Sequence, residues 1–144
     1  MNPDTFDPIP PDRAEAIAGS LNQEPFLRWI GIRFEDVRSG YARLRLPYRK
    51  ELNQGDGVVH GGAIAAAIDT AVIGAILSTL RDRPRRLATV DLHVQYLDRV
   101  VDEDVIAEAR VRRRGQTIVF VEVDARTDGG REVAHGEVSC RVTG

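Results

Sequence analysis

The chain has 144 residues, which favours one domain that buries a core of its own. Its formal net charge of -2 excludes the strongly basic balance of proteins that bind nucleic acid or anionic membrane surfaces. A single cysteine, Cys140, excludes an internal disulfide framework and fits a reducing cytoplasm.

The first 24 residues are interpreted as an extension that precedes the main domain, expected over residues 25–144. Residues 1–11 are rich in proline and aspartate, and we expect them to be loosely held. They show neither the basic nor the apolar region of a secretory signal. We therefore expect a cytoplasmic protein.

Two short helices are predicted before the first strand. Asp12 is expected to cap a helix over residues 13–21, because Glu15 occupies the capping-box position. Pro25 is expected to open a further helical turn over residues 26–30, since proline is favoured at the first position of a helix.

Two strands follow, over residues 31–37 and 41–47, with a turn at Ser39 and Gly40 between them. In the second strand three apolar residues alternate with two arginines, which is the period of a strand with one buried face. The residues predicted to point inward are Ala42, Leu44 and Leu46.

The middle of the chain is a long apolar helix, predicted over residues 61–80 and preceded by a glycine-rich polar loop. Its apolar residues surround the axis, which is typical of a helix buried on nearly all sides. The stretch is long enough to cross a bilayer, but its many alanines favour insertion only weakly. Asp69, its one charged residue, would lie near the centre of the bilayer, so we expect a buried core helix.

Four segments with strand periodicity complete the chain. In the first, Val94 and Tyr96 are predicted to share one face with Ala88, Val90 and Leu92, and Thr89 to lie on the opposite face. The segments cover residues 88–96, 105–111, 117–125 and 133–142. The predicted fold class is α+β, with an antiparallel sheet of about five or six strands wrapped around the long helix.

Asp69 is the most unusual residue in this pattern. An ionised acid inside an apolar helix is costly to bury unless it is paired, neutralised or functional. No lysine, arginine or histidine lies within one helical turn of it in the sequence. We therefore interpret Asp69 as a candidate base or nucleophile, although a structural acid bonded to Thr70 or Thr89 stays possible.

The order of these elements resembles that of the hotdog-fold thioesterases, and most closely their phenylacetate-degradation, PaaI-like branch. The residues that carry the resemblance are His60-Gly61-Gly62 at the helix start, Asp69, and the segment 88–91 in the next strand. The resemblance implies hydrolysis of an acyl- or aryl-coenzyme A thioester without cofactor or metal. It also implies a homodimer that pairs into a tetramer, with no nucleic-acid or membrane partner.

The resemblance also implies roles for individual residues. The helix start supplies free N–H groups and the positive end of the dipole, so the Gly61 N–H is the expected oxyanion donor, beside Gly62. Either Asn53 or Gln54 is expected to polarise the carbonyl, and Thr89 to hold the attacking water. His60 is a candidate base, but the resemblance implies that it shapes the loop.

Two arginine clusters are candidates for binding the phosphates of coenzyme A. One follows the long helix and the other precedes a hairpin turn; solvated turn charge explains either cluster equally well. The clusters are Arg81, Arg83, Arg85 and Arg86, and Arg112, Arg113 and Arg114.

Two other functions are compatible with this fold. A hotdog hydratase or dehydratase normally pairs an aspartate with a histidine on the loop and helix start, a pattern that is absent here. A non-catalytic acyl-CoA sensor has no need of a buried acid such as Asp69. A metal site from His93 and His135 is not expected, because no spacing suggests a third ligand.

Overall fold

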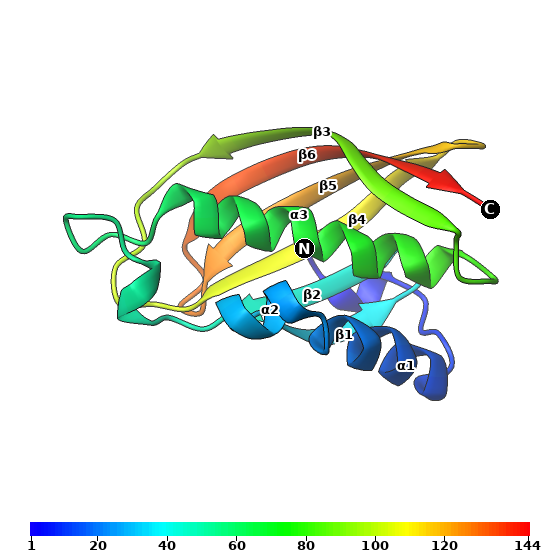
Figure 1. Ribbon diagram of the computed structural model, residues 1–144, viewed down its shortest axis with the longest axis horizontal. Helices are drawn as coiled ribbons and strands as arrows, with labels where there is room; N and C mark the ends of the chain where they lie inside the picture. Colours follow the sequence, from blue (N-terminus) through cyan, green and yellow to red (C-terminus); the bar gives the residue numbers. More distant parts are fainter.

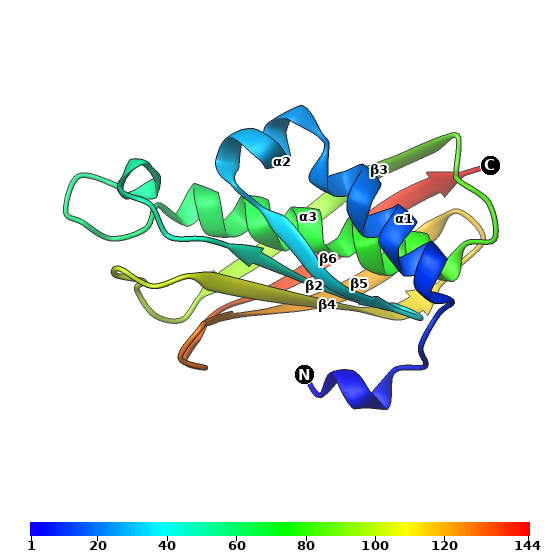
Figure 2. The same ribbon diagram turned by 90° about the horizontal axis from the view of Figure 1, so that it is seen from below.

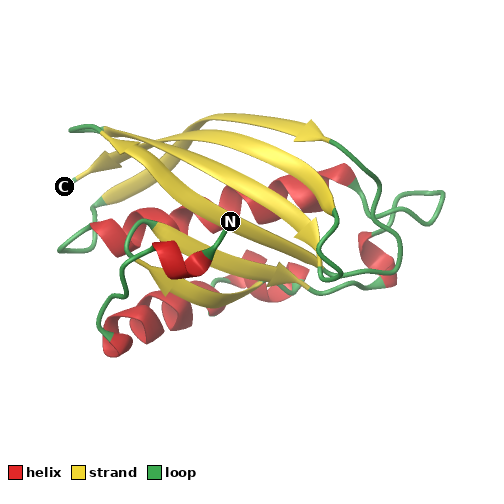
Figure 3. Cartoon of the chain, turned by 180° about the vertical axis from the view of Figure 1, so that it is seen from behind, coloured by secondary structure: helices red, strands yellow, loops and turns green.

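The computed structural model describes residues 1–144. One six-stranded antiparallel sheet, in the order β1-β2-β4-β5-β6-β3, curls around the long helix α3 (Gly61–Thr79), as Figures 1 and 3 show. The strands are β1 (Arg33–Arg38), β2 (Tyr41–Leu46), β3 (Arg86–Tyr96), β4 (Val105–Arg114), β5 (Ile118–Thr127) and β6 (Glu132–Thr143). The predicted α+β hotdog architecture is confirmed.

Helix α3 lies against the concave face of the sheet, and this position explains its all-round apolar sequence. It is long and apolar enough to cross a membrane, but most of that stretch is buried inside the fold. Gly136 lets β6 approach closely, since a Cβ there would lie 2.5 Å from the side chain of Ile68. Gly74 does the same for Phe34 of β1, at 2.5 Å. The helix is therefore the core of the domain.

Strand β3 forms one edge of the sheet and has only β6 as a neighbour. A β-bulge between Thr89 and Asp91 leaves Val90 outside the ladder. The bulge places Thr89 on the same face as Tyr96, since both side chains bond to α3. The predicted strict alternation of this strand is therefore wrong.

The two short helices cover the β1 side of α3 (Figure 2). Helix α1 (Pro11–Asn22) begins at a proline, and no side chain caps it. The predicted capping box of Asp12 and Glu15 is wrong, because Pro11 can start a helix without an N–H of its own. Helix α2 (Pro25–Ile30) starts at Pro25 as predicted.

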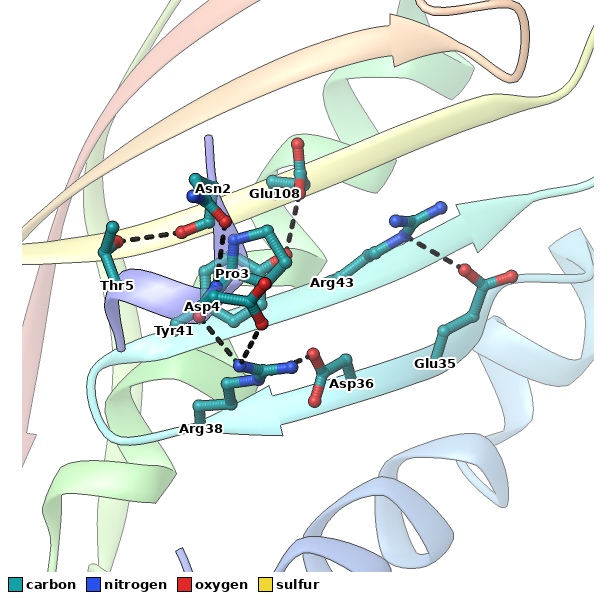
Figure 4. A network of polar contacts seen from close by, with 10 residues as sticks. All are labelled: Asn2, Pro3, Asp4, Thr5, Glu35, Asp36, Arg38, Tyr41, Arg43 and Glu108. Carbon is teal, nitrogen blue, oxygen red and sulfur yellow. Dashed lines mark hydrogen bonds and ion pairs between the residues drawn. The ribbon is translucent and has the colours of Figure 1, made fainter. Parts of the chain in front are cut away.

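The N-terminal segment packs on the outer face of the sheet, so the expectation that it is loosely held is wrong. Its short 3-10 helix, Pro3–Thr5, lies beside β2, where Arg38 donates to the Pro3 carbonyl at 2.9 Å (Figure 4). The Phe6 ring stacks on Tyr41 with centroids 4.7 Å apart. Beneath it the Tyr41 hydroxyl donates to Glu108 at 2.7 Å, and burial raises the pKa of Tyr41.

Candidate active site

The start of α3 leaves one backbone donor without a partner. His60 is the N-cap, and its Nδ1 accepts from the Gly62 N–H at 2.8 Å. The His60 carbonyl accepts from Ala63 at 2.9 Å and from Ile64 at 3.4 Å. Of the four N–H groups that a helix start leaves unsatisfied, only that of Gly61 has no acceptor within the chain. It is therefore free to bind developing negative charge at the positive end of the helix dipole.

Tyr96, at the end of β3, contacts this helix start and was missed by the sequence reasoning. Its hydroxyl donates to the Gly61 carbonyl at 2.7 Å, and a Cβ on Gly61 would lie 3.2 Å from its ring. A Cβ on Gly62 would lie 2.9 Å from His60 Nδ1. The two glycines thus make room for Tyr96 and His60 of the same chain. A glycine pair at a helix start signals close approach, but it does not identify the approaching residue.

A surface cleft of about 290 Å³ lies beside Gly61. Its lining is mostly apolar, with Ile64, Tyr96 and Leu97 among the contributing residues. Gln54 also lines this cleft, and its side chain contacts Asp56, which lowers the pKa of that carboxyl together with the Val58 N–H. The cleft therefore combines an apolar wall, an amide side chain and the free Gly61 N–H.

Asn53 does not line this cleft. Its Nδ2 donates to the Tyr48 hydroxyl at 3.0 Å, and its Oδ1 is buried without a partner. Its backbone pairs with Val59 in an isolated β-bridge, which closes the loop ahead of α3. Of the two residues expected to polarise a carbonyl, only Gln54 shares a cleft with Gly61.

Asp69 lies half-buried in the middle of α3. The Thr89 hydroxyl donates to its Oδ1 at 2.7 Å, and no basic side chain pairs with it. Cys140 lies behind Thr89, with its Sγ 3.7 Å from the hydroxyl oxygen. Burial raises the pKa of Cys140, so this thiol stays protonated at neutral pH. Thr89 uses its one donor on Asp69, and the second carboxylate oxygen has no partner within the chain.

The groups of residues around Gly61 and around Asp69 are separated along α3. Gly61 and Asp69 are eight residues apart, or roughly 12 Å along the axis at 1.5 Å per residue. Each is bonded to a residue of the edge strand β3: Gly61 to Tyr96 and Asp69 to Thr89. One chain therefore carries two half-sites along the same open edge.

Part of each arginine cluster meets at the other end of α3. Arg114 donates to the Thr79 carbonyl at 2.9 Å. With Arg81 and Arg83 it lines a polar cleft of about 440 Å³. Arg112 instead pairs with Glu122 at 3.4 Å, so the predicted cluster of residues 112–114 does not act as one surface.

His93 lies on β3, opposite Glu137 of β6, and His135 lies on β6, opposite Gln95 of β3. His135 Nδ1 is 2.9 Å from Asp124, and Glu122 completes a group whose ligand atoms lie within 4.8 Å of one another. Glu122 is already paired with Arg110 at 2.9 Å and with Arg112. The group is therefore a charge-balanced network on the outer face of the sheet.

Comparisons with known proteins agree on one family. A family model described as the thioesterase superfamily matches residues 56–134. A Halobacterium salinarum protein named as an esterase is 38% identical over 141 residues, 91% of this chain and 93% of that protein. The medium/long-chain acyl-CoA thioesterase YigI of Escherichia coli is 28% identical over 118 residues, 72% of this chain and 76% of that protein. The solved structure of the E. coli PaaI protein from the phenylacetic acid degradation operon matches with a TM-score of 0.83. It covers 92% of this chain and 95% of that chain at 18% identity.

Proposed function

Because the chain belongs to the thioesterase superfamily and is a thioester hydrolase with the hotdog fold, we propose that it hydrolyses aryl- or medium-chain acyl-CoA thioesters in the cytoplasm. The products are the free acid and the coenzyme A thiol. The observation that carries this proposal is the single free N–H at Gly61, beside an apolar cleft. The name of the E. coli relative, a medium/long-chain acyl-CoA thioesterase, supports the substrate class.

The proposed chemistry uses the two half-sites together. The Gly61 N–H, with Gln54 beside it, binds the thioester oxygen as negative charge develops on it. Asp69 takes a proton from a water that attacks the carbonyl, or attacks the carbonyl itself to form an anhydride that water then hydrolyses. In either route the C–S bond breaks, and coenzyme A leaves as the thiol with a proton that comes from the water. Thr89 holds the Asp69 carboxylate in place through its hydrogen bond at 2.7 Å. His60 holds the loop by capping α3, because its Nδ1 already accepts from Gly62.

We further propose that each site is shared between two chains. Roughly 12 Å along the axis separates Gly61 from Asp69, too far for one thioester carbon to reach both. A two-fold axis near Ala65 of α3 would bring the Gly61 of one chain to the Asp69 of the other. The same axis would pass near the middle of β3, so that Tyr96 and Thr89 of opposite chains also meet. Antiparallel pairing of the two β3 edges provides such an axis and covers an open sheet edge.

A panel of acyl-CoA thioesters tests this function through release of free thiol. The panel contains phenylacetyl-, benzoyl-, hexanoyl- and octanoyl-CoA. Asp69→Asn is nearly isosteric, so the variant should fold and lose at least about a hundredfold in kcat. A folded variant that keeps more than about a tenth of the rate, a loss of about 1.4 kcal/mol, would show that Asp69 has no catalytic role.

The same panel, extended by an enoyl-CoA, separates the two other functions. Hydration of an enoyl-CoA without thiol release would identify a hydratase. Tight binding of acyl-CoA without any turnover would identify a sensor.

A further inference from the structure

We propose that Tyr96 is a positioning residue that fixes the oxyanion donor at the start of α3. The proposal rests on the thioester hydrolysis proposed above and names a residue that the chemistry there does not use. Tyr96 contacts the helix start from a strand 35 residues later in the chain, through its hydroxyl and its ring.

The peptide unit between Gly61 and Gly62 is held at both ends. Its carbonyl accepts from the Tyr96 hydroxyl at 2.7 Å, and its N–H donates to His60 Nδ1 at 2.8 Å. The preceding peptide unit is held through the His60 carbonyl, which accepts from Ala63 at 2.9 Å. The Gly61 N–H belongs to that preceding unit, so its direction depends on both units.

Glycine makes this support necessary. Two successive glycines have the widest choice of backbone conformation, and helix ends fray. The Tyr96 hydroxyl adds a bond from outside the helix to the Gly61–Gly62 peptide, beside the bonds that the helix and its cap supply, and so narrows the directions open to the Gly61 N–H. Because an oxyanion donor works by being aimed before the charge develops, loss of this order reduces catalysis. Only the Tyr96 hydroxyl supplies such a bond from outside the helix and its cap.

The position of Tyr96 fits this role better than that of a packing residue. Its side chain lines the cleft of about 290 Å³ beside Gly61, and in the single chain the residue is 53% exposed. A core residue would contribute through burial, whereas the hydroxyl of Tyr96 points at one carbonyl. Removing that hydroxyl alone should therefore affect turnover more than stability.

The test compares Tyr96→Phe with a matched control, Tyr48→Phe. Both variants lose one phenolic hydroxyl, but that of Tyr48 bonds to Asn53 and Asp102, neither of which lines the cleft. We expect Tyr96→Phe to lower kcat about tenfold on octanoyl-CoA, the effect of one hydrogen bond, with KM and melting temperature unchanged. The loss should be equal on a short N-acetylcysteamine thioester, because the hydroxyl acts at the carbonyl. Tyr48→Phe should stay within twofold of wild type.

A second measurement does not depend on turnover. In protein labelled with carbonyl 13C at glycine, the Gly61 resonance should move upfield in Tyr96→Phe, because its carbonyl loses a hydrogen bond. Infrared spectra of carbonyl-labelled octanoyl-CoA bound to Asp69→Asn should show a thioester band at lower wavenumber than in solution. Adding Tyr96→Phe should return the band toward its solution value.

Three outcomes would overturn the proposal. The first is a Tyr96→Phe enzyme with kcat within twofold of wild type. The second is an equal loss in both phenylalanine variants, which would show a general sensitivity of this region. The third is a wild type that hydrolyses no panel thioester while the Gly61 resonance still responds. That result would refute the proposed function and leave Tyr96 as a structural support of the helix start.

Discussion

The two ends of α3 treat their unsatisfied backbone groups in opposite ways. At the start, the Gly61 N–H has no acceptor within the chain. At the end, Arg13 donates to the Leu77 carbonyl at 3.2 Å and Arg114 to the Thr79 carbonyl at 2.9 Å. Cations at a helix C-terminus stabilise it, whereas a free donor at the N-terminus adds nothing to stability. The difference shows that side chains cap the C-terminal end of α3, whereas its N-terminal end keeps one backbone donor free.

The sharpest test of the proposed half-site at the start of α3 is complementation between two inactive chains. One chain carries Asp69→Asn and the other Gly61→Pro, which removes the N–H at a position where proline is tolerated. If the site is shared, half of a random mixture is mixed dimer with one intact site of two, giving about a quarter of wild-type activity. A site within one chain predicts no recovery, because every site keeps one lesion.

This experiment needs a control on folding, because a Cβ at Gly61 would lie 3.2 Å from the Tyr96 ring. Light scattering and thermal melting of each homodimer should match wild type. Should Gly61→Pro misfold, Gln54→Ala is an alternative lesion in the same half-site. No recovery in dimers shown to be mixed would refute the shared site.

The arginines at the C-terminal end of α3 should bind coenzyme A rather than the acyl group. Replacing Arg81 and Arg83 by alanine removes two unpaired cations from the cleft of about 440 Å³. We expect KM for octanoyl-CoA to rise about fivefold, the effect of losing a charge-assisted bond. KM for its N-acetylcysteamine thioester should not change. Equal effects on both substrates would show that these arginines maintain structure instead.

Arg114 should behave differently, because it already bonds to the helix end. Arg114→Ala should lower the free energy of unfolding by about 1 kcal/mol, through loss of one hydrogen bond and one favourable charge near the dipole. That corresponds to a fall in melting temperature of about 2–5 °C, measurable by calorimetry. Arg113→Ala is the matched control, since no partner for Arg113 is present and its stability should be unchanged. A larger loss in the control would show that the capping bond is unimportant.

The smallest effect on stability is expected at Asp56, in the loop that leads to the start of α3. Its pKa is lowered by Gln54 first and by the Val58 N–H second. A lowered pKa in the folded state means that the contribution to stability is present at neutral pH. It is lost as pH falls through the lowered value. Asp56→Asn should change the melting temperature at pH 7 by no more than about 2 °C, and the difference from wild type should shrink as the pH falls below the ordinary pKa of an aspartate.

The sequence predicts the framework of the fold because its signals are periodic and local. The long helix and the alternating strands follow from spacing alone, as α3 and β2 show. Two errors have a common cause. The bulge at Val90 and the packing of residues 1–6 on Tyr41 depend on neighbours distant in sequence, and no local pattern reports them.

The candidate site is only partly visible in the sequence for the same reason. Asp69 stands out because a charge interrupts an apolar helix, and its bond to Thr89 is one of the partners that the sequence suggests. The choice between Asn53 and Gln54 depends on which side chain the loop turns toward the cleft, which spacing does not encode. The catalytic roles of these residues stay predictions. Tyr96 occupies an ordinary strand position and is recognisable only from its contact with Gly61.

The bulge in β3 also identifies one residue whose removal would leave the pairing of β3 with β6 unchanged. In a regular strand, deleting a residue reverses the facing of everything beyond it. Val90 is the exception, because it lies outside the ladder between Thr89 and Asp91 and is 56% exposed. Its removal would keep Thr89 and Tyr96 facing α3 and would only reduce the local twist. A deletion at this position therefore shortens β3 without changing which of its side chains face α3.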